Sequence, residues 1–146
     1  MLLDANLLLY AVDRRSRDNA RASEWLQGVL TGDRRVGLPW QTIGAFLRIS
    51  THPRASEHPL TVGEAWAYVA SWVAADPVWI PAATGRTVSV LADLLAHHDV
   101  AGNLITDAQL AALAIEHGLV LCSADSDFAR FRGLKWLNPL VDRRRS

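Results

Sequence analysis

The stretch MLLDANLLLY, residues 1–10, places one aspartate, Asp4, between two apolar runs. A carboxylate among buried apolar neighbours costs free energy unless hydrogen bonds or an opposite charge compensate it. Asn6 is the only polar side chain close to Asp4 in the sequence. The apolar residues before Asp4 predict a short buried strand, and the spacing after it predicts a helix over 6–12. This stretch therefore predicts a strand followed by a helix, with an acidic side chain at the junction.

The same alternation continues along the chain. Thr61 and Glu64 have the spacing of a capping box, which predicts a helix start, and Gly118 predicts a helix end. Alternating strands and helices indicate a mainly parallel sheet covered on both faces. We therefore expect an α/β fold, specifically a three-layer α/β/α sandwich. Strands are predicted at 1–3, 36–38, 78–80, 119–122 and 135–137, and helices at 16–30, 41–51, 61–73, 84–97 and 107–117.

The composition indicates one globular domain over residues 1–146, with residues 142–146 as a frayed tail. Half of the 146 residues are apolar, and the formal net charge is zero, so net charge alone argues neither for nor against nucleic acid as a partner. The single cysteine, Cys122, excludes an internal disulfide and suits a reducing compartment. We expect no signal peptide and no membrane segment, and hence a cytoplasmic protein.

Acidic residues follow two of the predicted strands directly. Asp4 follows the first strand, and Asp125 and Asp127 follow the strand that ends near Cys122. Asp107 opens the predicted helix that leads into that same strand. Ligands in parallel sheets bind beyond the carboxyl ends of the strands, so these acids are predicted to converge on one edge.

Three of the four acids also have a simpler explanation when taken alone. Asp107 has the placement of an ordinary first-turn helix acid, which the helix dipole favours. Asp125 and Asp127 have the placement of residues that cap the turn carrying Phe128. Asp4 lacks such an explanation because apolar residues surround it. We favour a shared site.

Three motifs resemble the PIN domain, a magnesium-dependent nuclease fold. Residues 4–10, DANLLLY, resemble its opening D-x-N-hydrophobic motif. Residues 107–114, DAQLAALA, resemble its D-A-x-x-A-A-x-A helix, and residues 123–128, SADSDF, resemble its T-x-D-x-D-F turn. The segments LPW at 38–40, FLRIST at 46–51 and KWLNP at 135–139 resemble one branch of the VapC toxins of bacterial toxin–antitoxin pairs. The resemblance covers almost the whole chain.

One position departs from the family pattern. The family places a glutamate three residues before an arginine on the second long helix, and counting back from Arg48 reaches Ala45. The VapC branch that this chain resembles also lacks that acid, so its absence does not imply inactivity. Glu64, Asp99 and Asp127 are the alternatives for the missing ligand, and the sequence does not choose among them.

Clustered carboxylates repel one another unless a cation neutralises them. Oxygen ligands without a convergent histidine or cysteine set favour Mg²⁺, with Mn²⁺ as a substitute. Such an ion activates water for hydrolysis of a phosphodiester. We assign Asp4, Asp107 and Asp125 as the catalytic residues and metal ligands. The supporting residues are Asn6, which orients Asp4, Thr106 and Ser123, which position a water or a phosphate, and Asp127, a fourth acid.

Basic residues are almost all arginines, since Lys135 is the only lysine. Arginine suits bidentate contacts to phosphate, so a phosphate-binding rim around the acids is plausible. The VapC resemblance implies RNA as the substrate, a VapB-type antitoxin as a partner, and a homodimer.

Two other functions stay open. A PIN fold without the glutamate at Ala45 is compatible with a module that binds RNA or protein without cleavage. A phosphotransferase in which Asp4 attacks phosphorus resembles haloacid-dehalogenase-like enzymes, but these have an aspartate two positions later, where this chain has Asn6.

Overall fold

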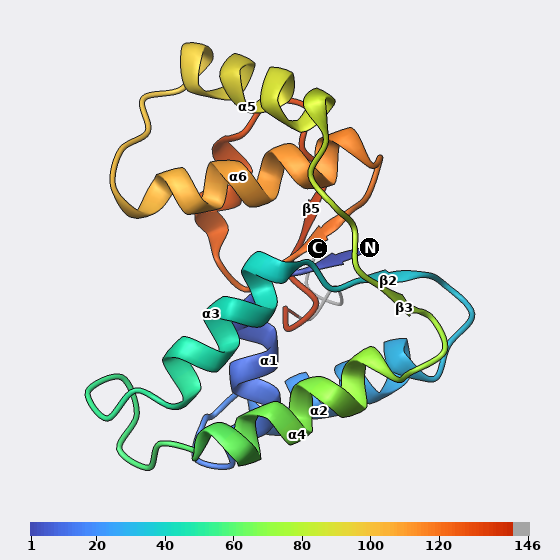
Figure 1. The fold of residues 1–146 in the computed structure, drawn as a ribbon, viewed down its shortest axis with the longest axis vertical. Helices are drawn as coiled ribbons and strands as arrows, with labels where there is room; N and C mark the ends of the chain where they lie inside the picture. Colours follow the sequence, from blue (N-terminus) through green and yellow to red (C-terminus); the bar gives the residue numbers. More distant parts are fainter. Residues whose placement is uncertain (142–146) are drawn as a thin grey trace.

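The computed structural model describes residues 1–141 and contains a sheet of five parallel strands (Figure 1). The strands follow the spatial order β3-β2-β1-β4-β5, with every neighbouring pair parallel. The frayed tail predicted at 142–146 lies outside the described residues. The strands are β1 (Leu2–Leu3), β2 (Val36–Gly37), β3 (Val78–Trp79), β4 (Leu121–Cys122) and β5 (Trp136–Leu137).

Each strand is shorter than predicted because the chain turns soon after two paired residues. Asp4 already caps the helix that follows β1. Pro39, two residues after β2, occupies the N-cap of the next helix and has no N–H group for a ladder. The strand ends therefore place polar side chains close to the sheet edge.

Within residues 1–141, six α-helices and one 3-10 helix surround the sheet, largely where the sequence predicts helices. Thr61 and Glu64 form the predicted capping box, and Gly118, with φ of 65°, follows the end of α6 as predicted. The predicted start of α6 was four residues too late. The helix begins at Asn103, because Gly102 with φ of 59° allows the chain to turn into the helix earlier. The helices are α1 (Ala5–Val12), α2 (Asn19–Leu30), α3 (Trp40–Ser50), α4 (Val62–Val73), α5 (Gly85–His97), α6 (Asn103–Glu116) and η1 (Ser126–Arg130).

Successive strand residues point to opposite faces of the sheet, which creates two separate cores. Leu3 and Cys122 pack in one core with residues of α1 to α4. Leu2 and Leu121 pack in the other core with residues of α5 and α6. Figure 1 shows α5 and α6 on one side of the strands and α1 to α4 on the other. The predicted three-layer α/β/α sandwich with a parallel sheet is confirmed.

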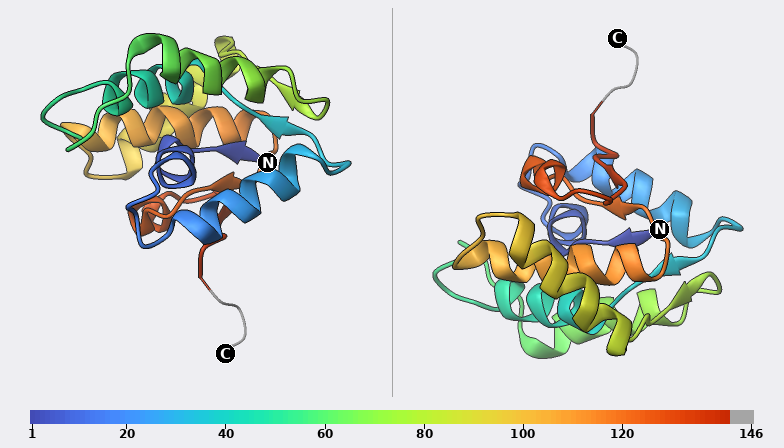
Figure 2. Two further views of the ribbon diagram at one scale, coloured as in Figure 1. Left: turned by 90° about the horizontal axis from the view of Figure 1, so that it is seen from below. Right: turned by 90° about the horizontal axis from the view of Figure 1, so that it is seen from above.

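Helix α6 contacts the sheet, whereas α5 lies outside it. Figure 1 shows α6 between α5 and the strands, and α5 lies in front of α6 in the right-hand view of Figure 2, which is seen from above. The burial agrees, because α6 buries six residues and α5 buries only Thr87 and Leu94. The alanine-rich sequence of α6 suits this place, since small side chains let the helix approach the strands closely.

Two individual side chains test the sequence interpretation. Cys122 ends the apolar stretch 119–122, which favours a buried side chain, and it is buried in the core. Trp66 falls on the apolar helical spacing of the segment 61–73, which favours a core position, but the residue is half exposed, because the buried stripe of α4 consists of Ala65, Val69 and Trp72. Within residues 1–141, no helix combines the length and the apolar character that crossing a membrane requires.

Candidate active site

The carboxyl ends of β1 and β4 meet at one edge of the sheet. Leu3 pairs with Cys122 in parallel register, and the backbone N–H of Asp4 donates to the carbonyl of Cys122 at 3.0 Å. The side chains that follow these strands, from Asp4 and from Ser123 onward, therefore lie next to each other. The structure thus joins two segments separated by more than a hundred residues.

Asp4 is the N-cap of α1, and two hydrogen bonds hold its carboxylate. Its Oδ1 accepts from the backbone N–H of Ala5 at 2.7 Å, and its Oδ2 accepts from the hydroxyl of Ser123 at 2.7 Å. Burial raises the pKa of Asp4, the two hydrogen bonds lower it, and the negative charge of Asp125 raises it. These two bonds offset part of the cost of an aspartate between two apolar runs.

Ser123 is fully buried and uses its whole hydrogen-bonding capacity. Its Oγ accepts from Nδ2 of Asn6 at 3.0 Å and from the backbone N–H of Asp125 at 3.0 Å. A hydroxyl has two lone pairs and one proton, so the proton is directed to Asp4. Asn6 acts on Asp4 through Ser123, and its own Oδ1 accepts from the N–H of Ala124 at 3.3 Å. The hydroxyl of Ser123 is therefore directed at a carboxylate, where the sequence suggested a water or a phosphate.

Three carboxylates lie together beside Asp4. Asp107, Asp125 and Asp127 each offer one oxygen, and these oxygens lie within 4.8 Å of one another. The pKa of Asp107 is raised to about 6, mainly by burial and then by the charges of Asp125, Asp4 and Asp127, while the charge of Arg130 lowers it. Asp4 is outside the three-oxygen group, but its charge acts on Asp107. We call Asp4, Asp107, Asp125 and Asp127 together the acidic cluster.

The position of Asp107 within α6 excludes its simpler explanation. Asp107 is the fifth residue of the helix, and the first turn of α6 contains no acid. A first-turn role at the positive end of the helix dipole therefore does not account for it. The neighbouring Thr106 is exposed, and its hydroxyl donates to the carbonyl of Asn103 at 2.7 Å.

Asp125 serves the local turn as well as the acidic cluster. It is the N-cap of η1, and its Oδ1 accepts from the backbone N–H of Asp127 at 2.9 Å. The turn-capping explanation is therefore correct for Asp125, and it coexists with the clustering. The same hydrogen bond fixes the backbone of Asp127 relative to the carboxylate of Asp125.

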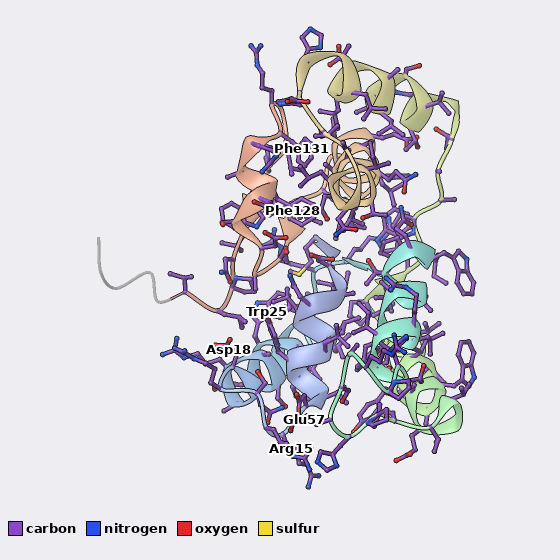
Figure 3. All side chains as sticks on the ribbon, turned by 90° about the vertical axis from the view of Figure 1, so that its left-hand side faces the viewer. Arg15, Asp18, Trp25, Glu57, Phe128 and Phe131 are labelled. Carbon is purple, nitrogen blue, oxygen red and sulfur yellow. The ribbon has the colours of Figure 1, made fainter. Side chains whose placement is uncertain are left out.

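Two phenylalanines anchor η1 against the core. Phe128 and Phe131 lie between η1 and α6 (Figure 3), with ring centroids 6.3 Å apart. They are 1% and 3% exposed, in the same core cluster as α6 residues such as Leu113. On the other side, Nε1 of Trp136 donates to the carbonyl of Ser123 at 3.1 Å. These contacts hold the turn that carries Asp125 and Asp127.

The structure also separates the alternatives for the acid missing at Ala45. Glu64 is exposed and accepts the N–H of Thr61 in the capping box. Asp99 is exposed, and within residues 1–141 it does not belong to any group of three side chains that could together hold a metal ion. Asp127 is the alternative that lies with Asp107 and Asp125. The sequence signal for it was the Asp-Ser-Asp spacing directly after a strand.

The three grouped ligands are all carboxylates, with no histidine or cysteine among them. Hard oxygen donors of this kind fit Mg²⁺ or Mn²⁺ better than Zn²⁺. Burial contributes most to the raised pKa of Asp107, and the charges of Asp125, Asp4 and Asp127 add to it, so a bound cation would relieve repulsion within the cluster. The donor set therefore fits a divalent cation.

Relatives of known family match nearly the whole chain. The family model for the PIN domain matches residues 1–134. Ribonuclease VapC37 of Mycobacterium tuberculosis is 41% identical over 138 residues, which cover 94% of this chain and 96% of the relative. Ribonuclease VapC43 of the same species is 34% identical over 140 residues, which cover 96% of this chain and 95% of the relative.

Solved structures share the fold at much lower identity. VapBC2 from Rickettsia felis, bound to a DNA fragment from its promoter, has a TM-score of 0.68 at 13% identity and covers 94% of this chain and 96% of its own. Mycobacterium tuberculosis VapC20, described as a toxin that cleaves the sarcin-ricin loop, has a TM-score of 0.66 at 16% identity. The match covers 92% of this chain and 98% of VapC20. With these matches and the geometry above, the chain belongs to the PIN domain family and, within it, to the VapC proteins.

Proposed function

We propose that this protein is a Mg²⁺-dependent endoribonuclease and the toxin of a type II toxin–antitoxin pair. The observation that carries the proposal is the acidic cluster at the carboxyl edge of β1 and β4, in a chain 41% identical to a protein named Ribonuclease VapC37. The cluster supplies the charge and ligands that metal-assisted phosphodiester hydrolysis needs.

Asp4, Asp107 and Asp125 would hold the cation, directly or through water, and Asp127 joins them as the fourth acid. When bound, Mg²⁺ or Mn²⁺ would lower the pKa of a water molecule and offset the negative charge that develops on the phosphate. Ser123 and Asn6 keep the carboxylate of Asp4 in one orientation. Asp125, as the cap of η1, fixes the backbone of Asp127.

The direct test is cleavage of structured RNA by the purified protein with Mg²⁺ or Mn²⁺. We expect cleavage by the wild type, loss of cleavage in Asp4→Asn and in Asp107→Asn, and no loss in Asp93→Asn. Asp93 is a matched control because it is an exposed aspartate on α5. Cleavage that persists in EDTA, or full activity in both cluster variants, would refute this mechanism.

The two alternative functions predict different results in the same assay. Ala45 in place of an acid favours a module that binds RNA without cutting it, and RNA that binds but stays intact even with Mn²⁺ would support that function. A phosphotransferase would form a phosphoryl bond to Asp4. Both oxygens of Asp4 already accept hydrogen bonds, which disfavours Asp4 as a nucleophile.

We further propose that a VapB-type antitoxin binds a cavity between α1, α3 and the loop 51–60. The cavity has a volume of about 510 Å³ and is lined by apolar residues such as Leu9, Phe46 and Ile49. Arg15 and Glu57, both labelled in Figure 3, also line it. Ser50 also lines the cavity, and its buried Oγ has no hydrogen-bond partner within residues 1–141. An amphipathic segment matches this mainly apolar lining with charged residues at its margin.

Filling the cavity tests this assignment. Ala55 lines the cavity and is exposed, so Ala55→Trp obstructs it without disturbing the core. We expect this variant to lose copurification with the product of the adjoining reading frame, while the control Ala83→Trp, at an exposed position outside the cavity lining, keeps it. Equal recovery of both complexes would place the antitoxin elsewhere.

We also propose a homodimer that uses α4. Val62, Trp66 and Val73 are exposed and lie within about 40° of one another around the helix axis. A second copy of this chain would cover this apolar stripe. Light scattering should give a dimeric mass for the wild type and a monomeric mass for Trp66→Glu; a wild-type monomer would refute the proposal.

The cytoplasmic location of the protein stays a prediction.

A further inference from the structure

The side chain of Arg130 lies against the acidic cluster. Arg130 is the last residue of η1, and its Nη2 donates to Oδ1 of Asp127 at 3.3 Å. Its Nε donates to the backbone carbonyl of Asp127 at 3.1 Å. Because the carboxylate of Asp127 lies in the group with Asp107 and Asp125, these two bonds hold a permanent positive charge at the rim of the cluster.

Other arginines with known contacts are engaged away from the cluster. Arg21 donates to the carbonyl of Leu140. Arg35 stacks over the ring of Trp79 at 4.2 Å. Burial and three carboxylates raise the pKa of Asp107, and Arg130 is the basic side chain whose charge lowers it. The location of Arg130 therefore distinguishes it from the general arginine content of the chain.

The guanidinium group of Arg130 retains donors for a ligand. Arginine has five N–H groups, and the two bonds to Asp127 use two of them. The side chain is 38% exposed. A phosphodiester approaching the acidic cluster is repelled by its carboxylates, so a cation at the rim lowers the cost of approach. A planar group with free, parallel N–H donors matches two phosphate oxygens.

We propose that Arg130 contacts a phosphodiester of the RNA bound at the acidic cluster, tethered there by Asp127. This inference rests on the proposed function, and it goes beyond it by assigning one substrate-contacting residue among many arginines. The tether fixes where the contact is made, because Nε and one N–H of Nη2 stay bound to Asp127 while the remaining N–H groups are left for the phosphate.

The test measures RNA binding separately from cleavage. A fluorescein-labelled structured RNA, of the kind used in the cleavage assay, is titrated with the full chain in Ca²⁺, a larger cation than Mg²⁺ that is used to suppress cleavage. We expect Arg130→Gln to weaken binding about tenfold and to reduce the slope of log affinity against log salt by about 1. Arg130→Lys keeps the charge without the planar fork and should lie between the wild type and Arg130→Gln.

Arg132→Gln is the matched control. Arg132 is an exposed arginine two positions after Arg130, and it donates a hydrogen bond to His98 through its backbone N–H. Thermal unfolding of each variant verifies that it is folded. Unchanged affinity in Arg130→Gln, or an equal loss in Arg132→Gln, would overturn the inference while wild-type cleavage leaves the proposed function standing. A wild type that neither binds nor cleaves RNA would refute both.

Discussion

The hydroxyl of Ser123 donates a 2.7 Å hydrogen bond to Oδ2 of Asp4, which lies 119 positions earlier in the chain. Two N–H groups, from Asn6 and from the backbone of Asp125, occupy the lone pairs of the same hydroxyl. The proton of Ser123 therefore has one destination, and the carboxylate of Asp4 has a fixed orientation. This arrangement connects three members of the site through one buried atom.

Removing that hydroxyl should weaken metal binding. Ser123→Ala leaves Oδ2 of Asp4 without its donor and two N–H groups without their acceptor, in a fully buried position. We expect about 1–3 kcal/mol of lost stability in urea unfolding and a loss of about tenfold in Mn²⁺ affinity by calorimetry. Ser123→Thr keeps the hydroxyl and should keep the Mn²⁺ affinity. Wild-type affinity in Ser123→Ala would show that the bond does not position Asp4.

Metal affinity should depend on pH through Asp107. The pKa of Asp107 is raised to about 6, so protons compete with the cation below that pH. Titrations with Mn²⁺ should show an affinity that falls as the pH drops through about 6. Asp107→Asn should bind more weakly and lose this pH step. An affinity that is flat from about pH 8 to pH 5 would contradict the prediction.

The same pKa shift predicts the pH dependence of stability without metal. A carboxyl group whose pKa is raised in the folded state favours folding below its unfolded pKa of 3.8, and this contribution is lost as the pH rises through about 6. Asp107→Asn should therefore raise the melting temperature at about pH 8 and have little effect below about pH 4. Differential scanning calorimetry in EDTA measures this.

Asp93→Asn, at an exposed position, serves as the control and should not show that pattern. In the wild type, added Mg²⁺ should raise the melting temperature at pH 8, because a ligand that binds only the folded state stabilises it. A destabilised Asp107→Asn at pH 8 would show that Asp107 is not under electrostatic strain.

Asp127 should matter for the metal, whereas Glu64 should not. Asp127→Asn removes one of three grouped carboxylates, so we expect about tenfold weaker Mn²⁺ binding. Glu64→Gln keeps the cluster intact and alters only the capping box of α4. Its Mn²⁺ affinity should match the wild type, with a small decrease in melting temperature. The reverse ranking would identify Glu64 as the replacement for the acid missing at Ala45.

The anchor of η1 should support both stability and the site. Phe128 is 1% exposed, so Phe128→Ala should cost about 3–5 kcal/mol in urea unfolding. Because η1 carries Asp127, Mn²⁺ affinity should fall as well, even in protein that is still folded. Phe128→Leu preserves most of the volume and should lose much less of both. Unchanged metal affinity in folded Phe128→Ala would show that the turn keeps its shape without the ring.

Local sequence patterns were sufficient for the order of elements and for the sheet. The apolar run before Asp4, the capping box at Thr61 and the glycine at Gly118 each depend on neighbours within a few residues, and each appears in the structure as expected. Alternating strands and helices imply a parallel sheet, whose carboxyl ends share one edge. The convergence of Asp4, Asp107 and Asp125 follows from that topology.

The orientation of the side chains at that edge required the tertiary structure. The sequence offers Glu64, Asp99 and Asp127 equally as the fourth acid, and packing of Phe128 and Phe131 against α6 places Asp127 in the group. The destination of the Ser123 proton depends on donors from Asn6 and Asp125 that meet only when β1 lies beside β4. Periodicity reports which face a residue occupies, whereas hydrogen-bond direction and carboxylate spacing depend on atoms brought together from distant parts of the chain.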